Sequence, residues 1–178
     1  MDEQFTKYTH VNVDLDIATK RAALRASASV VGLISVRREG GETLFNASGT
    51  IYETSENGDG KYLSRIVTSA SLFGSVAHKD IYIKVFTAGG IVFDGIVMGH
   101  DAHYNLAIID IISDVLLPAA RLRILDDSVS LDPISVQCSL DNARPHSRKF
   151  KICAGDMLVA LGRSCKNFDI MSAAGKLR

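Results

Sequence analysis

The chain has 178 residues, a length that fits one ordinary domain, or a domain with part of a second, and that can bury a sizeable core. Lysine plus arginine and aspartate plus glutamate both number 20, so the formal net charge is zero, and the two signs are interspersed along the chain. Without a basic block to follow a phosphate backbone, the sequence argues against nucleic-acid binding.

The hydrophobic fraction of 47% and the charged fraction of 22% are ordinary for a globular protein, and no stretch approaches the roughly 20 apolar residues of a membrane span. We therefore expect a soluble protein. Residues 1–7 contain acidic side chains and no basic segment followed by an apolar run, so we expect a cytoplasmic or nuclear location. Three widely spaced cysteines predict free thiols in a reducing compartment: Cys138, Cys153 and Cys165.

The first predicted element is a short amphipathic helix in Leu15–Ser29, which is rich in Ala, Leu, Arg and Lys, lacks Gly and Pro, and has Asp14 or Asp16 as a cap. From Val30 onward, short β-branched runs alternate with Gly, Asn, Asp and Ser clusters, which is typical of an antiparallel sheet or barrel. The six predicted strands are Val30–Arg37, Leu44–Glu53, Leu63–Thr68, Ile81–Ala88, Ile91–Gly99 and Leu106–Ile112.

Two turns are marked by composition: a polar Gly-rich loop at residues 55–60 and a tight hairpin at Gly89-Gly90. Beyond Leu117-Pro118 the pattern weakens into a connector, and two more strands are predicted at Met157–Leu161 and Phe168–Ala173. The predicted fold is all-β with a short N-terminal helix. We divide it into an extension with the helix (1–28), a complete first barrel (29–118), and a linker with a partial second barrel (119–178).

Several segments, in the right order and spacing, resemble the HtrA/Deg branch of the trypsin-like (chymotrypsin-fold) serine proteases, which consist of two six-stranded barrels. Those similar to the family's first-barrel strands and active-site segments are Ser29–Leu33, Ala47–Ile51, Ile66–Leu72, Phe93–Asp101 and Tyr104–Ile109. Gly155–Arg163 resembles the strand that opens the second barrel, and Met171–Lys176 resembles the strand that follows. The resemblance covers about residues 22 to 178, and implies a trypsin-like β-barrel with its active site between the barrels.

The resemblance also implies where the catalytic residues would stand, and both positions are altered. The segment that holds the family's catalytic histidine has Ser71, and the segment that holds the aspartate has Asn105. A serine hydroxyl is a very poor base at neutral pH, so Ser71 cannot activate a nucleophile. Asn105 has no charge to stabilise an imidazolium, a change that costs about 10⁴-fold in rate in the serine-protease example.

The nucleophile of the family lies in a Gly-Asn-Ser-Gly-Gly type turn, and no such turn follows Ala174-Gly175 in this sequence. The oxyanion hole that the turn builds is missing with it. We therefore expect no enzymatic activity, no cofactor and no metal. His100, Asp101 and His103 are too few for a zinc site, and they and His78 are interpreted as solvated loop residues.

Two more interpretations stay open as expectations. Cys138 is predicted to be a structural thiol, because no matched histidine lies in the family pattern. An enzyme with relocated catalytic residues would need a histidine, a nucleophile and a Gly-rich turn to converge in a cleft, and the sequence shows no such pattern.

The function expected from the resemblance is that of a pseudoprotease: a non-catalytic module that binds a protein or a peptide strand by addition to a sheet edge, with self-association as a further expected property. The alternative is a truncated fragment of a larger serine protease-like protein without independent activity. A decaying copy without a selected role is compatible with the same residues. No nucleic-acid or membrane partner is expected.

Overall fold

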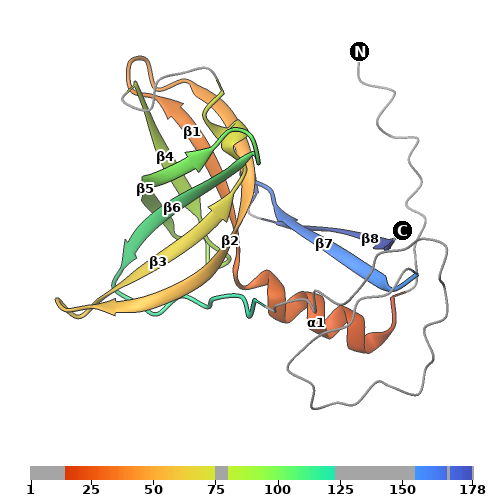
Figure 1. The fold of residues 1–178 in the computed structure, drawn as a ribbon. Helices are drawn as coiled ribbons and strands as arrows, with labels where there is room; N and C mark the ends of the chain where they lie inside the picture. The colour runs from red at the N-terminus through yellow and green to blue at the C-terminus, as the bar shows by residue number, and fades with distance from the viewer. Residues whose placement is uncertain (1–14, 75–79, 123–154, 168, 178) are drawn as a thin grey trace.

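The computed structural model describes residues 15–74, 80–122, 155–167 and 169–177 of the chain (Figure 1). Within these ranges the protein is mostly β. The elements in chain order are α1 (Ile17–Ser27), β1 (Val30–Arg37), β2 (Thr43–Asn57), β3 (Lys61–Thr68), the 3-10 turn η1 (Ala70–Leu72), β4 (Ile81–Phe86), β5 (Val92–Asp101), β6 (Leu106–Ser113), β7 (Met157–Arg163) and β8 (Ile170–Lys176).

Strands β1 to β6 form a closed antiparallel barrel in the order β1-β2-β3-β6-β5-β4, and β4 returns to pair with β1. Consecutive strands pair with each other except β3 and β4, and the β3–β6 and β4–β1 pairings join strands that are not consecutive in sequence. Strands β7 and β8 form a separate two-stranded hairpin beside the barrel (Figure 1). The expectation of an all-β fold with a six-stranded barrel and a short N-terminal helix is confirmed.

The barrel closes because alternate residues of its strands are apolar and point inward. The fully buried aliphatic side chains come from five of the six strands and from the turn η1: Val31, Leu33, Ile51, Ile66, Leu72, Ile83, Val85, Ile109 and Ile111. All of them belong to the same core cluster. The barrel therefore has one continuous core that draws on strands from both halves of its sequence.

Gly49 is placed where the wall of the barrel has no room for a side chain. A Cβ atom at this position would lie 2.7 Å from Ile66 Cγ2 and 2.8 Å from Leu33 Cδ1. Real Cβ atoms do not approach other atoms this closely, so glycine is required here for packing. Gly49 lies in the Ala47–Ile51 segment, which the sequence assigned to a strand.

The largest difference from the predicted strands is the β2–β3 hairpin. Residues 55–60 were expected to be a loop, but β2 continues to Asn57 and pairs with β3 up to Asn57↔Lys61. This hairpin projects beyond the barrel (Figure 1). The hydroxyl groups of its polar residues Thr54 and Ser64 form a hydrogen bond across the strands at 3.0 Å. Polar residues here therefore belong to paired strands and do not mark a loop.

The other predicted boundaries agree with the structure to within a few residues, and β1 agrees at both ends. The hairpin at Gly89-Gly90 is present, since the Gly90 amide donates to the Thr87 carbonyl at 3.0 Å and Gly90 has a φ of 76°. The predicted connector is described only as far as residue 122, so most of it lies outside the described residues. The strands expected near residues 157 and 168 are present as β7 and β8.

Helix α1 leads directly into β1. Its N-cap is Asp16, which accepts from the Thr19 amide at 2.9 Å and from the Thr19 hydroxyl at 2.6 Å. None of its residues is buried, and Ile17 and Leu24 are 69% and 67% exposed. In the part of the chain that the structure describes, no helix is long and apolar enough to cross a membrane.

Arg163, at the end of β7, joins the hairpin to α1 and the barrel. Its side chain is almost fully buried; Nε donates to the Val30 carbonyl at 2.7 Å and Nη2 donates to the Ser27 carbonyl at 2.8 Å. The Arg163 amide donates to Ser48 Oγ at 3.0 Å. Burial lowers the pKa of Arg163 from its ordinary value. One residue thus connects β7 with the end of α1, β1 and β2.

Candidate functional site

Two turns lie side by side at one end of the barrel. The first is η1, which follows β3, and the second joins β5 to β6. The β3–β6 ladder ends at Thr68↔Ala107, so the residues just after Thr68 and just before Ala107 must meet. The Ala70 amide donates to the Asn105 carbonyl at 3.2 Å, which ties the two turns together through the main chain.

The side chain of Asn105 is the centre of a hydrogen-bond cluster. Its Oδ1 atom accepts from Ser69 Oγ at 2.9 Å, from the Ser71 amide at 2.9 Å and from Ser71 Oγ at 3.0 Å. A backbone N–H can only donate, so the Asn105 atom that faces it must be the amide oxygen. The two positions that the resemblance assigns to the catalytic histidine and aspartate are therefore in direct contact.

The backbone at Asn105 is in the left-handed region, with a φ of 53°. Asparagine tolerates this conformation better than most residues. The turn before it is shaped by Asp101, whose Oδ1 accepts from the amides of His103 and Tyr104 at 2.8 and 3.0 Å. Local hydrogen bonds and the choice of asparagine thus hold the amide group under η1.

The serines reach Asn105 because of how η1 begins. Ser69 caps the turn and its Oγ accepts from the Ser71 amide at 3.1 Å, which turns the chain sharply after the last residue of β3. Ser71 is exposed, whereas Leu72 and Phe73 beside it are buried in the core. The apolar pair anchors the turn and leaves the hydroxyl group at the surface.

Two of the histidines considered from the sequence lie near this cluster. His100 was expected in a loop, but it lies within β5, and its ring packs edge-on against Phe73 with the centroids 5.5 Å apart. His103 lies in the β5–β6 turn and packs against Tyr104 at 4.7 Å. The loop interpretation is therefore wrong for His100 and Asp101, because the β5–β6 ladder continues through both residues. Both are exposed, as expected. His78 lies outside the described residues.

The cluster offers hydrogen-bond donors and acceptors but no group with the chemistry of a base. An amide oxygen is not basic at neutral pH, and a serine hydroxyl that donates to it gains no nucleophilicity. Electrostatic activation of the kind that an aspartate gives to an imidazole requires a charge and a ring, and neither is present at Ser71 or Asn105. The arrangement stabilises two turns and exposes a polar surface.

No group of three or more His, Cys, Asp or Glu side chains suited to holding a metal occurs within residues 15–74, 80–122, 155–167 and 169–177. Cys165 is half-buried, and its Sγ lies 3.4 Å from the Leu33 carbonyl. Burial raises the pKa of Cys165, which lowers the reactivity of the thiol. Cys138 and Cys153 lie outside the described residues.

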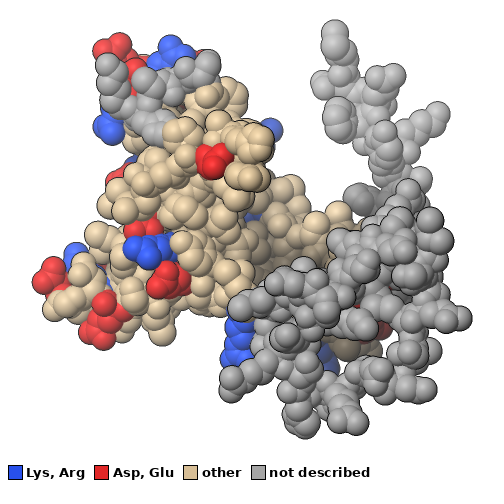
Figure 2. All heavy atoms as spheres, viewed as in Figure 1, with Lys and Arg blue, Asp and Glu red and all other residues tan. Residues whose placement is uncertain are grey.

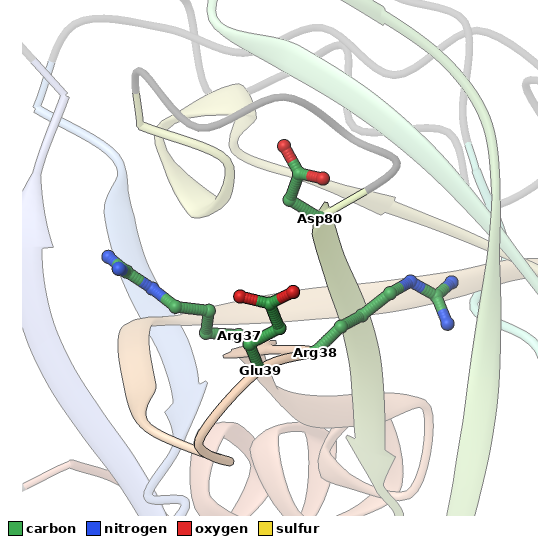
Figure 3. A pocket seen from close by; sticks show the side chains of 4 residues that line it. All are labelled: Arg37, Arg38, Glu39 and Asp80. Carbon is green, nitrogen blue, oxygen red and sulfur yellow. The ribbon is translucent and has the colours of Figure 1, made fainter.

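A surface hollow at the end of β1 was not anticipated from the sequence. It is lined by Arg37, Arg38, Glu39 and Asp80, and the two arginine side chains extend in opposite directions (Figure 3). Arg37 Nε lies 4.0 Å from Glu42 Oε2, so part of its charge is already balanced. Because the two guanidinium groups do not converge, the hollow does not form an anion-binding site.

No protein-family model matches the chain, and no curated protein has a sequence that matches it significantly. The fold and the site define a closed six-stranded antiparallel β-barrel protein with a short N-terminal helix and an attached β-hairpin. Its distinguishing local feature is the cluster of Ser69, Ser71 and Asn105 at one end of the barrel.

Two features of this structure carry weaker sequence signals. Arg163 follows an apolar run at the end of β7. Its buried hydrogen bond to the Val30 carbonyl could not be predicted from this position, because the acceptor lies far away in the sequence. The Ser69 cap has a recognisable signal, since a serine just before a short turn commonly accepts from an amide two or three residues later.

Proposed function

We propose that this chain is a non-catalytic relative of the trypsin-like, HtrA/Deg-like proteases that acts as a protein-interaction module. The observation that carries the proposal is the contact between Ser71 and Asn105, whose hydroxyl and amide groups meet at 3.0 Å. A trypsin-like first barrel has six strands and places its histidine and aspartate positions next to each other. The structure has a six-stranded barrel with Ser71 and Asn105 adjacent.

The proposed absence of catalysis rests on the chemistry of the two groups. Ser71 cannot act as a general base, and Asn105 has no charge to stabilise a cation. Among the residues of β7, β8 and their connecting turn that the structure describes, the sequence has no Gly-rich serine turn to supply a nucleophile and an oxyanion hole. In this proposal all three catalytic roles are unfilled.

An interaction role is supported by the β7–β8 hairpin. Its sheet has two strands, and residues on both of its faces are apolar and exposed, including Met157 at 44%, Leu158 at 41% and Met171 at 51%. A two-stranded hairpin is marginally stable alone and its edges can accept a further strand. An extended peptide from a protein partner would add a third strand to this sheet and cover exposed apolar side chains, with main-chain hydrogen bonds giving affinity.

The proposal makes two separate claims and each has its own experiment. For catalysis, the purified chain is incubated with a fluorescent protein substrate and with a fluorophosphonate probe, with trypsin as a positive control. We expect neither hydrolysis nor labelling. Turnover that disappears on a single substitution in this chain would contradict the claim, because it would show a working active site.

For binding, ten-residue peptides are selected from a displayed random library and their affinity is measured by fluorescence anisotropy. Each selected peptide is compared with a version that is N-methylated at alternate amides, which keeps the side chains and removes main-chain donors. Edge addition predicts that N-methylation in one of the two alternating registers abolishes binding. Equal binding of all versions would contradict edge addition.

A second candidate is a truncated fragment of a larger serine protease-like protein, without activity of its own. The same exposed hairpin favours it, because apolar residues on both faces of a hairpin are typical of strands that are covered on both sides. Thermal unfolding followed by circular dichroism and light scattering separates the two candidates. A sharp transition from a defined species supports the module, and a broad transition with aggregation supports the fragment.

A further inference from the structure

The outer surface of β3 and β6 carries apolar side chains at positions that alternate with the core. Residues 64, 66 and 68 of β3 and residues 107, 109, 111 and 113 of β6 are buried in the barrel, so the residues between them point outward. We call the six residues between them the β3–β6 face: Leu63, Arg65, Val67, Ile108, Asp110 and Ile112. Asp110 is itself only 3% exposed and Ile112 is 42% exposed, whereas the other aliphatic residues of the face are half-buried. Four of these six are aliphatic, although they lie on the outside of the barrel.

The apolar surface continues onto the neighbouring strand. On β5, Ile96 and Met98 are 50% and 56% exposed, and Ile96 is paired with Asp110 in the ladder. Figure 2 shows this side of the barrel as a mostly uncharged surface, with a small group of acidic and basic side chains near its middle. Scattered exposed aliphatic residues are ordinary, but a continuous apolar area on a strand face indicates an interaction surface.

The charged residues within this surface form a row across the strands. Arg65 Nη1 lies 3.4 Å from Glu53 Oε2, and Arg65 Nε lies 3.6 Å from Asp110 Oδ1. Glu53, Arg65 and Asp110 are successive cross-strand neighbours on β2, β3 and β6, so their signs alternate negative, positive, negative. A phosphate backbone or an anionic membrane would find no excess of positive charge here.

The β3–β6 face is complementary to itself. The register pairs Leu63 with Ile112, Arg65 with Asp110 and Val67 with Ile108. A two-fold axis parallel to the strands, between β3 and β6, places β3 of one copy opposite β6 of the other. Each aliphatic residue then faces an aliphatic residue of the other copy. The Arg65 position of each copy lies opposite the Asp110 position of the other, where the carboxylate is buried and paired with Arg65 of its own chain, so the aliphatic contacts carry the match.

We propose that a second copy of this chain packs against the β3–β6 face, related by a two-fold axis that runs parallel to the strands between β3 and β6. The interface is isologous, so each contact occurs twice. Because the formal net charge of the chain is zero, no long-range repulsion opposes the approach of two copies. The inference does not depend on the loss of catalysis.

The extent of the face sets the expected strength of association. From Leu106 to Ile112 the face is about 20 Å long, and together with the neighbouring β5 it is about 10 Å wide between the outer strand axes. This is smaller than the roughly 800 Å² that each partner contributes to a standard interface. The homodimer is therefore weak and its population depends on protein concentration.

The experiment is sedimentation velocity on the full chain over a series of concentrations from micromolar to millimolar, with three variants. Ile112→Glu and Leu63→Lys each place one charge in the face, at positions that oppose each other in the dimer. Leu24→Glu is the matched control, because it makes the same kind of change at an exposed apolar residue of α1, away from the face. Circular dichroism verifies that each variant is folded.

We expect the weight-average mass of the wild type and of Leu24→Glu to rise toward twice the monomer mass with concentration. Ile112→Glu and Leu63→Lys each stay monomeric alone. An equimolar mixture of the two associates, because the carboxylate introduced at position 112 of one chain meets the ammonium group introduced at position 63 of the other. A wild type that stays monomeric at every concentration would overturn the proposal. So would variants that associate like the wild type, or a mixture that stays monomeric.

Discussion

Ser71 and Asn105, which lie 34 residues apart in the chain, are joined by two hydrogen bonds that both end on the amide oxygen of Asn105. The same oxygen accepts a third bond from Ser69 Oγ. At the positions where the resemblance places an acid–base pair, the molecule has a set of neutral hydrogen bonds. The contact therefore stabilises the two turns, and its contribution to the free energy of unfolding can be measured.

The first prediction concerns Asn105. Asn105→Ala removes the oxygen atom that accepts three hydrogen bonds. It also places alanine, which is less tolerant of the left-handed region than asparagine, at a φ of 53°. We expect a loss of about 2 kcal/mol in the free energy of unfolding, from the lost hydrogen bonds and the left-handed backbone. Urea denaturation followed by circular dichroism measures it.

Two companion variants separate the causes. Asn105→Gly keeps the backbone conformation and loses the hydrogen bonds, so we expect a loss of about 1 kcal/mol. Asn105→Asp keeps an acceptor oxygen and is expected to unfold at about the wild-type urea concentration at neutral pH. If Asn105→Asp is as unstable as Asn105→Ala, the hydrogen bonds do not contribute as described.

The barrel could be predicted from the sequence because its signal is local. Short runs rich in β-branched residues form strands such as β1 and β6, and clusters of Gly, Asn, Asp and Ser separate them, so the number and order of the strands follow from residues near one another. The ends of β2 could not be predicted in the same way. Residues 54–57 are polar and resemble a loop, and only their pairing with β3 makes them a strand.

The candidate site was predictable only in part. The resemblance pointed to Ser71 and Asn105, but the third partner, Ser69, and the direction of all three hydrogen bonds depend on the geometry of η1. Arg163 and the β3–β6 face had no sequence signal that distinguished them. Their roles arise from contacts between residues more than 40 positions apart, which periodicity does not report.

The second prediction tests the packing role of Gly49. Gly49→Ala adds a Cβ atom that would lie 2.7 Å from Ile66 Cγ2 and 3.0 Å from the Val67 carbonyl oxygen. Because backbone and core atoms must shift, we expect a loss of about 1 to 3 kcal/mol in the free energy of unfolding. Thermal and urea denaturation give the value.

Gly99→Ala is the control for Gly49, because Gly99 also lies in a barrel strand but a Cβ added there would have no neighbouring atom within 4 Å. Its effect is expected to stay within about 0.5 kcal/mol of the wild type. Equal destabilisation by the two substitutions would show that backbone flexibility, rather than the close approach at Gly49, is responsible.

The third prediction concerns the attachment of the hairpin by Arg163. Arg163→Met keeps much of the side-chain volume and removes the donors to the Val30 and Ser27 carbonyls. We expect about 2 kcal/mol of local stability to be lost, since hydrogen bonds from charged groups are stronger than neutral ones. Hydrogen–deuterium exchange should become roughly 30-fold faster in α1 and β7.

The exchange rates of core barrel amides, such as that of Ile109, serve as the internal control for Arg163→Met, because the barrel closes without the hairpin. Arg163→Lys is expected to give an intermediate effect, since one ammonium group cannot match the planar donors that reach two carbonyls. Uniform acceleration over the whole chain would instead place Arg163 in the global folding unit and contradict a local role.

The last prediction is the pH dependence of helix α1. Hydrogen bonds from the Thr19 side chain, and then from the Thr19 amide, hold the pKa of Asp16 below its ordinary value. An aspartate with a lowered folded-state pKa stabilises the helix fully above the ordinary value of about 3.9, and the effect is lost as pH falls through the lower pKa. NMR Cα shifts of residues 17–20, recorded from neutral to acidic pH, should move toward coil values only below the ordinary aspartate pKa.

Asp16→Asn is the matched variant, because asparagine caps a helix without titrating. The Cα shifts of residues 17–20 in this variant should stay constant with pH, and the Ile109 amide signal shows that the barrel is intact. If the Asp16→Asn helix frays at the same pH as the wild type, the transition belongs to another carboxyl group.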